Sequence, residues 1–445
     1  MKVRLANPLT RVEGHSELII TQKRDNQVEV AYRLPSTRDF QNILIGQHIQ
    51  DLPKIVTRIC GICPISHRIG ALKALETAFE VKIPHVAELL RELAFLGEII
   101  RSHTYSVFFS TLPDLMHLAN QVSRQDIIGV DKTQSRVLPV AIKLYRAAEK
   151  LVTETAGNTN MAYNLILGGV RNNITLDQQQ QLVNTLHTLL PDIKWAKEFY
   201  LWLLNEIEGE IHHFILPKPL FISSFDTNNN RFSGTDYVTL FTHEQPVHTF
   251  SPQDLSHQLR ERTQPEFPTS IAYTSFQYPK LRFLAGPHAR LAALQTKTTN
   301  KQASIGIPNL FYAGLLRLDE IEFSVINALR LLESEWNIAG NLSTHWQSQP
   351  VTGASAVEAP RGSLLYHLEV SDKQTIKALQ IVVPTELNLL ALTEITKNIV
   401  STCLDLGWTV NQTMERAQMG IRCFDPCVSC ATNTDIRFRE SPVIH

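Results

Sequence analysis

The chain has 445 residues, 43% of them hydrophobic and 19% charged, and this balance suits a globular protein with a substantial core. Its 42 Lys and Arg residues nearly match its 43 Asp and Glu residues, so the net charge indicates neither a nucleic-acid partner nor a membrane surface. We expect a cytoplasmic protein, because no apolar run reaches the ~18 residues of a membrane span and the N-terminus lacks the apolar segment of a signal peptide.

The first half of the chain predicts a β-hairpin followed by long helices. Residues 1–35 are expected to form an antiparallel hairpin, because 16–21 and 27–32 alternate apolar and polar side chains. Residues 36–215 are expected to be mainly helical, with a stripe of apolar residues running from Val86 to about Ser110. Pro64 should end or kink the helix before it, and Leu112-Pro113-Asp114 should close the striped helix.

The second half predicts a β-containing insertion and a return to helix. Prolines and the run from Asn228 to Asn230 make helices unfavourable in residues 216–285, which we interpret as a peripheral insertion. Residues 286–420 complete the helical core with residues 36–215, although Ser363 to Leu368 is strand-like. Residues 421–445 carry two closely spaced cysteines, Cys427 and Cys430, and we expect them to form a metal-binding C-terminal segment and a tail. The expected fold class is α+β, mainly α, with a central bundle of long helices in a single domain of residues 1–445.

Four of the six cysteines form two Cys-x-x-Cys pairs near the ends of the chain, Cys60 with Cys63 and Cys427 with Cys430. Six cysteines are too few for a disulfide scaffold, so such pairs indicate metal binding or redox chemistry. Four thiolates are also the ligand set that a soft transition metal prefers. Spacing alone leaves three interpretations open: a catalytic transition metal, a structural zinc ion, or a dithiol redox site.

The residues beside the cysteines favour the catalytic metal. Arg58 precedes the first pair, and a cation near thiolates favours their deprotonated form. His67 follows the first pair and could hydrogen-bond a metal-bound sulfur. Asp425, two residues before Cys427, is an acid that a structural zinc site does not require. A loop glutamate such as Glu13 would be interpreted as solvated if it stood alone.

The motifs taken together resemble the large subunit of nickel–iron hydrogenases, in the family's order and over nearly the whole chain. They are Thr10-Arg-Val-Glu13-Gly-His15, Arg58-Ile-Cys60-Gly-Ile-Cys63-Pro-Ile-Ser-His67, Ser102-His103 with Leu112-Pro113-Asp114, Gly286-Pro287-His-Ala289-Arg290, Glu358-Ala-Pro360-Arg361-Gly362 and Asp425-Pro-Cys427-Val-Ser-Cys430. Each motif alone is a weak signal, whereas six in order are specific.

The resemblance implies a ligand set and an activity. Cys60, Cys63, Cys427 and Cys430 would bind nickel. Cys63 and Cys430 would also bridge to an iron that carries cyanide and carbon monoxide. The implied reaction is the reversible heterolytic cleavage of H2, which needs a soft Lewis acid, a base for the proton and a dry pocket.

The resemblance also implies roles for residues around the metals. Glu13 would relay protons beside the nickel, and Arg361 would lie over the open metal position as a base or polarising group. Asp114 and Asp425 would hold that arginine, and Pro360 would line the diatomic ligands.

Electrons released at such a site would need a partner protein. Cys403 and Cys423, interpreted as small buried hydrophobic residues, cannot ligate iron–sulfur clusters that need about four cysteines each. The resemblance implies an iron–sulfur small subunit, together with further flavin or iron–sulfur subunits. It is strongest to the cytoplasmic multi-subunit hydrogenases that exchange electrons with NAD(P) or another soluble carrier. The alternative is a non-catalytic or H2-sensing subunit with a modified site.

Three positions depart from the family's pattern. Gln41 stands where a glutamate helps to hold magnesium or a similar ion, and Asn433 stands where His or Arg ends the last motif. Gln is a weaker ligand for a hard cation, so the magnesium site is in doubt. Met161-Ala162 replaces a His-Pro pair. Because residues Thr434 to His445 follow Asn433, we expect a tail that is not removed by proteolysis and stays folded against the body.

Overall fold

The protein is described by a computed structural model. It describes residues 2–6, 9–22, 28–34, 40–122, 126–211, 214, 218–242, 245–262, 272–295, 309–334 and 340–431. Helices predominate and the sheets are small, which confirms the expected α+β, mainly α class. A large hydrophobic cluster joins buried side chains from Leu9 to Ala431, so both ends of the chain contribute to one core.

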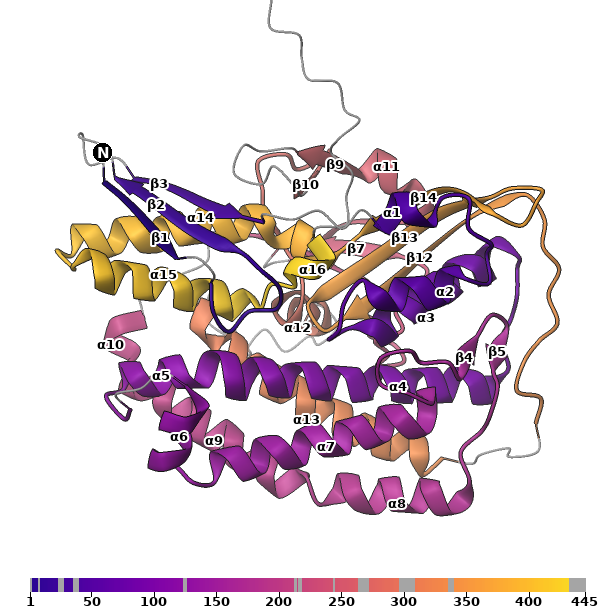
Figure 1. The fold of residues 1–445 in the computed structure, drawn as a ribbon, viewed down its shortest axis with the longest axis horizontal. Coiled ribbons are helices and arrows are strands. Elements are labelled where there is room, and N and C mark those ends of the chain that lie inside the picture. Colours follow the sequence, from indigo (N-terminus) through magenta and orange to yellow (C-terminus); the bar gives the residue numbers. More distant parts are fainter. Residues whose placement is uncertain are drawn as a thin grey trace, which may run out of the picture.

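Long helices form one side of the molecule (Figure 1). Helix α4 spans His85–Thr104 and packs between α7, Val137–Ala156, and α13, Ala313–Leu332, while α8, Leu176–His187, and α9, Leu190–Glu206, cover α13. Gly157 ends α7 at φ +82°, a left-handed conformation that glycine adopts without strain. Nearly every side chain of α4 is buried, which makes this helix the axis of the region.

Two prolines begin helices, and both predictions for them are wrong. The chain after α4 continues through a π-helical stretch, Tyr105–Thr111, into α5, Leu112–Leu118. Pro64 opens α3, Pro64–Ala78, which follows the short helix α2, Leu52–Ile55, and the 3-10 turn η1, Val56–Arg58. Proline fits the first turn of a helix because the N–H it lacks has no partner there. The segment Leu112-Pro113-Asp114 therefore begins helix α5 and does not end a helix.

The N-terminal hairpin is confirmed and gains a strand. Strands β2, Glu17–Gln22, and β3, Val28–Arg33, pair antiparallel, and β1, Lys2–Ala6, adds to the other edge of β2. The side chains of Leu18, Ile20, Val30 and Tyr32 are buried, as the alternation predicts. Figure 1 shows this sheet beside α14, Pro384–Asp405, and α15, Val410–Phe424.

Residues 286–420 are not purely helical. They contain α12, Pro287–Gln295, but also an antiparallel sheet of β12, Val351–Ala359, β13, Gly362–Val370, and β14, Ile376–Val382. Helix α3 packs on this sheet so closely that a Cβ at Gly353 would lie 2.2 Å from the Ala74 carbonyl oxygen. Ala359 pairs with Gly362, so Pro360 and Arg361 form the tight turn of a hairpin.

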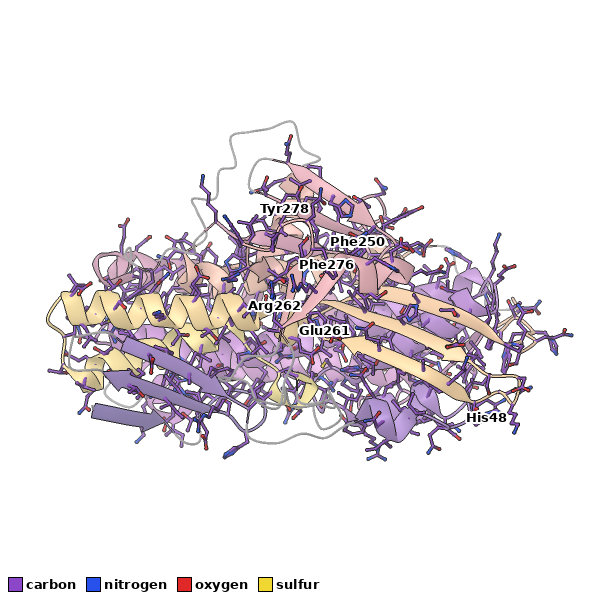
Figure 2. All side chains as sticks on the ribbon, turned by 90° about the horizontal axis from the view of Figure 1, so that it is seen from above. His48, Phe250, Glu261, Arg262, Phe276 and Tyr278 are labelled. Carbon is purple, nitrogen blue, oxygen red and sulfur yellow. The ribbon has the colours of Figure 1, made fainter. Side chains whose placement is uncertain are left out.

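Residues 216–285 contain short β-strands, as expected, although the inner part of this stretch is not peripheral. One sheet has four strands in the order β11-β6-β7-β8: β11 is Phe283–Leu284, β6 is Leu220–Ser223, β7 is Val238–Phe241 and β8 is Pro246–Phe250. A second sheet pairs β9, Leu259–Arg262, with β10, Ala272–Ser275. Strand β6 is buried, because Leu220 and Ile222 share a hydrophobic cluster with Leu365 and Leu387. Figure 1 shows β9 and β10 at the top of the molecule, and Figure 2, seen from above, labels Phe276 and Tyr278, which follow β10, and His48 near one end of the molecule.

The C-terminal helices return the chain to its start. Helices α14 and α15 pack against each other, and the short α16, Val428–Ala431, follows in the middle of the molecule (Figure 1). The expected retained tail, Thr434 to His445, lies outside the described residues. Within those residues no helix is long and apolar enough to cross a membrane.

Candidate metal centre

The two cysteine pairs meet at a single point. Cys60 and Cys63 lie between η1 and the start of α3, and Cys427 and Cys430 lie at α16. The four sulfurs all lie within 4.8 Å of one another, with Sγ–Sγ distances of 3.3 Å for Cys60–Cys427 and 3.6 Å for Cys63–Cys430. All four side chains are buried and none forms a disulfide. This convergence favours one four-thiolate metal centre over two separate redox pairs.

Hydrogen bonds hold the sulfurs in place. The backbone N–H groups of Ile62 and Cys63 each donate to Cys60 Sγ over 3.3 Å. His67 Nε2 lies 3.5 Å from Cys430 Sγ, and its Nδ1 lies 2.7 Å from the Tyr366 hydroxyl. Burial lowers the pKa of His67 to about 4, so the ring is neutral at pH 7. A neutral ring can donate to the sulfur from Nε2 while Nδ1 accepts from the tyrosine.

Glu13 lies beside this cluster. Its Oε2 accepts hydrogen bonds from the Cys427 thiol at 3.1 Å and from the Ser429 backbone N–H at 3.0 Å. Its own carbonyl accepts from the Val428 N–H at 3.1 Å. Since Glu13 is partly exposed, its carboxylate connects a buried sulfur with the outside of this chain. The structure thus places Glu13 within proton-transfer distance of one candidate ligand.

Arg361 is held by Asp425. Its Nε donates to the Asp425 carbonyl oxygen at 2.6 Å, and its Nη2 donates to Asp425 Oδ1 at 3.1 Å. Asp425 adopts φ +53°, a left-handed conformation that turns both groups toward the arginine. Burial opposes the charge of Arg361, but Asp425 and the nearby thiolates raise its pKa well above the ordinary value. The site therefore contains a permanent buried cation.

Asp114 does not play the expected part, and its prediction is corrected. Its carboxylate pairs with Arg11 at 2.5 Å and with Arg422 at 3.0 Å instead of with Arg361. All three residues tie the N-terminal loop, α5 and α15 together, because Arg11 also donates to Ser110 and Arg422 to Thr10. Asp114 thus stabilises the packing of the segments that surround the cysteine cluster.

Pro360 and Arg361 line a small cavity with three of the cysteines. Its walls are Cys63, His67, Ala359, Pro360, Arg361, Leu364, Pro384, Thr385, Cys427 and Cys430. The lining combines apolar side chains with one cation and three thiols. Such a lining suits small ligands beside a metal, since the apolar side chains exclude water and Arg361 supplies a charge.

Arg290 fixes the turn that carries Pro360 and Arg361, a role that the sequence did not reveal. It donates to the carbonyl oxygens of Ala359 at 3.0 Å and Pro360 at 2.9 Å. It also forms ion pairs with Glu320 and Glu358. The motif that ends at Arg290 was visible in the sequence, but only the fold brings its guanidinium to a hairpin 70 residues further on.

The two segments that carry these cysteines match a known family. Residues 38–123 and 325–433 match the family described as nickel-dependent hydrogenase. The chain thus resembles nickel-dependent hydrogenases in the two segments that build the candidate metal centre.

Hydrogenase subunits are similar to this chain along most of its length. It is 25% identical to a subunit of the F420-non-reducing hydrogenase vhu of Methanococcus voltae, over 86% of this chain and 94% of that protein. It is 21% identical to the beta subunit of the NAD-reducing hydrogenase HoxS of Cupriavidus necator, over 96% of this chain and 94% of that protein. The solved NAD+-reducing NiFe hydrogenase in the H2-reduced state has the same fold, with a TM-score of 0.87 at 24% identity over 97% of this chain and 99% of that one.

The structure describes two of the three departures from the hydrogenase pattern. The Gln41 side chain accepts a hydrogen bond from the Ile381 backbone N–H at 3.1 Å, and Asn433 lies outside the described residues. A magnesium ion near these positions therefore stays a prediction. Met161, which replaces the expected histidine, accepts a hydrogen bond at its carbonyl oxygen from Arg68.

Proposed function

We propose that this chain is the catalytic subunit of a nickel–iron hydrogenase and cleaves H2 heterolytically and reversibly. One observation carries the proposal. Four buried cysteine sulfurs lie within 4.8 Å of one another, and one of them touches the carboxylate of Glu13. A structural zinc site has no use for a carboxylate in contact with a ligand sulfur, whereas H2 cleavage needs a base at that place.

The donor set fits a nickel–iron centre. Thiolates suit nickel, and Cys60, Cys63, Cys427 and Cys430 would hold it. Cys63 and Cys430 would also bridge to iron, with Pro360 beside the cyanide and carbon monoxide that the iron would carry. When bound, the centre supplies the Lewis acid that polarises H2.

Glu13 would move the proton. The Cys427 thiol is within hydrogen-bond distance of Glu13 Oε2, so a proton on that sulfur has an acceptor 3.1 Å away. The Ser429 N–H holds the same oxygen and keeps the carboxylate aimed at the sulfur. Because Glu13 is partly exposed, it can pass the proton on toward solvent.

Arg361 would supply a fixed positive charge. Its side chain is 5% exposed, and the cavity that it lines contains Cys63 and Cys427. In such a water-poor place a charge that is already oriented acts strongly on a polarised substrate. Asp425 holds the guanidinium by two hydrogen bonds, so little reorganisation is needed during the reaction.

Electrons would leave through other subunits. In the part of the chain that the structure describes, the four cysteines are the only group of His, Cys, Asp or Glu that could hold a metal. We therefore infer an iron–sulfur small subunit, further flavin or iron–sulfur subunits, and a soluble acceptor such as NAD(P). A cytoplasmic location and a single domain over residues 1–445 complete the proposal, supported by six free cysteines and a core that joins both ends.

The alternative, a non-catalytic or H2-sensing subunit, is less well supported. A subunit without catalysis does not need the complete set of four thiols or the contact between Glu13 and Cys427. Both features are present.

Metal analysis with infrared spectroscopy of the purified complex tests the proposal. We expect one nickel per complex, with iron, and the stretching bands of cyanide and carbon monoxide. Zinc alone, with no such bands, would contradict it. Cys403→Ser is the matched control, because this cysteine is buried outside the cluster and should leave the metal content unchanged.

A further inference from the structure

Glu98 of α4 caps the helix that follows the first cysteine pair. Cys63 is the N-cap residue of α3, but its side chain makes no capping hydrogen bond. The first N–H groups of a helix have no partner within the helix. Here Glu98 Oε2 accepts from the Ile65 N–H at 2.7 Å, and Oε1 accepts from the Ser66 N–H at 3.0 Å and from the Ser66 hydroxyl. A carboxylate with two acceptor oxygens matches this set of donors.

Arg101 holds the same segment from the other side of Cys63. Its Nη2 donates to the Ile62 carbonyl oxygen at 3.0 Å. Glu98 and Arg101 are three residues apart, so they leave the same face of α4. Both are buried, at 0% and 4% exposure. One turn of one helix therefore fixes the backbone before and after a candidate metal ligand.

The hydrogen bond from Arg101 also influences the surroundings of the Cys60 sulfur. The Ile62 carbonyl and the Cys63 N–H belong to one planar peptide unit and point in opposite directions. When Arg101 fixes the carbonyl, it also fixes the direction of the N–H, which donates to Cys60 Sγ over 3.3 Å. A hydrogen bond to a thiolate draws charge from the sulfur and alters the metal that it binds.

The next residue of α4 meets the opposite side of the cavity. Ser102 Oγ lies 3.4 Å from Arg361 Nη1. The α4 turn from Glu98 to Ser102 thus contacts the first cysteine loop and the buried cation together. We propose that this turn is a positioning element of the metal centre, which sets the orientation of Cys63 and the hydrogen bonds to the Cys60 sulfur. The inference rests on the proposed function for the identity of the metals.

A matched control separates positioning from general stability. Glu92 is a second buried carboxylate of α4, and it also accepts two backbone N–H bonds, from Phe232 at 2.9 Å and Ser233 at 3.2 Å. Those residues do not belong to the cysteine loop. Glu98→Gln and Glu92→Gln both replace one acceptor oxygen by an NH2 donor, and only the first change faces the metal site.

The test compares the two variants in the purified complex at pH 8. Burial raises the pKa of Glu98 to about 7, so the wild-type side chain is mainly ionised there. Hydrogen–deuterium exchange is measured on the peptides covering residues 61–70, together with the positions of the infrared bands. For Glu98→Gln we expect about tenfold faster exchange in residues 62–66, from the loss of a charge-assisted hydrogen bond, and shifted bands. Glu92→Gln should change neither.

Unchanged exchange and unchanged bands in Glu98→Gln would overturn the proposal, as would equal changes in Glu92→Gln. Arg101→Gln is a second variant, and it should also speed exchange at residue 63 and shift the bands. If the wild-type complex holds no nickel or iron, the proposed function fails, whereas the exchange data still decide whether this turn orders the cysteine loop.

Discussion

Glu13 and Cys427 join the two ends of the chain, because their backbones form an isolated parallel bridge and their side chains meet at 3.1 Å. The contact depends on a close approach of the loops. Gly14 adopts φ +83°, and a Cβ there would lie 2.8 Å from the Val428 Cβ. The carboxylate is thus aimed at the sulfur by backbone packing, and this relationship is the basis of the proposed proton transfer.

Glu13→Gln should keep the metals and slow proton transfer. The amide can still accept from the Ser429 N–H, but it cannot take up a proton from Cys427. We expect H2/D+ exchange to fall by about a hundredfold or more, with nickel and iron content unchanged. Glu29→Gln, an exposed change on β3, is the control and should exchange at the wild-type rate. Wild-type exchange in Glu13→Gln would remove this residue from the pathway.

Arg361→Lys tests the fixed positive charge. Lysine keeps the charge, but it cannot reproduce the two bonds from Nε and Nη2 to Asp425. We expect about a hundredfold loss of exchange per nickel, because an oriented charge is lost from a dry site. Arg282→Lys, at a half-buried ion pair with Glu394, should have no such effect. A fully active Arg361→Lys enzyme would show that charge alone is enough.

Asp114→Ala should weaken the fold more than the turnover. The buried Arg422 and the partly buried Arg11 lose their carboxylate, and breaking a buried pair costs about 3–5 kcal/mol. The counterpart at the surface is Asp192→Ala, which loses contacts with the exposed side chains of Lys143 and Arg136 and should cost about 1 kcal/mol or less. Thermal unfolding of the two variants measures this difference. If Asp114→Ala unfolds like the wild type but loses exchange per nickel, Asp114 acts on the reaction after all.

Glu320→Gln should change how stability depends on pH. Burial alone would raise the pKa of Glu320, but the charge of Arg290 and the hydrogen bonds from Arg290 and His103 lower it to about 2. Because the pKa is lower in the folded state, the ionised carboxylate stabilises the fold at pH values above its ordinary pKa of 4.5. This stabilisation is lost as the pH falls toward 2. The stabilisation at pH 7 is about 3 kcal/mol. We expect wild type to unfold at a higher midpoint temperature than Glu320→Gln. The difference between the two midpoints should be constant above pH 6 and should become smaller below pH 5. A gap that widens on acidification would contradict this sign.

The sequence predicted the meeting of the four cysteines because each pair lies in one short motif. Two Cys-x-x-Cys pairs and a resemblance to hydrogenases were enough to bring Cys60 and Cys427 together. The partner of Asp114 was not predictable in the same way, because it depends on where the fold places Arg11 and Arg422. The hydrogen bond from Arg290 to the Pro360 carbonyl oxygen was not predicted, for the same reason.

The periodic helices were predictable, and the central sheet was predictable only in part, since residues 363–368 of β13 were already strand-like in the sequence. Helix α4 was visible through its apolar stripe. Strand β12, which was not predicted, is buried on both faces along most of its length and so lacks the alternation that marks a half-exposed strand. Pro113 was misread because a proline can start a helix as well as end one.

Formation of HD from D2 in ordinary water, by the purified complex without an added electron acceptor, measures heterolytic cleavage itself. Heterolytic cleavage leaves one deuteron exchangeable with solvent protons, so the account predicts that HD appears before H2, at a rate that falls with Glu13→Gln. A complex that contains nickel and iron in full amounts and yet forms no HD would contradict the account.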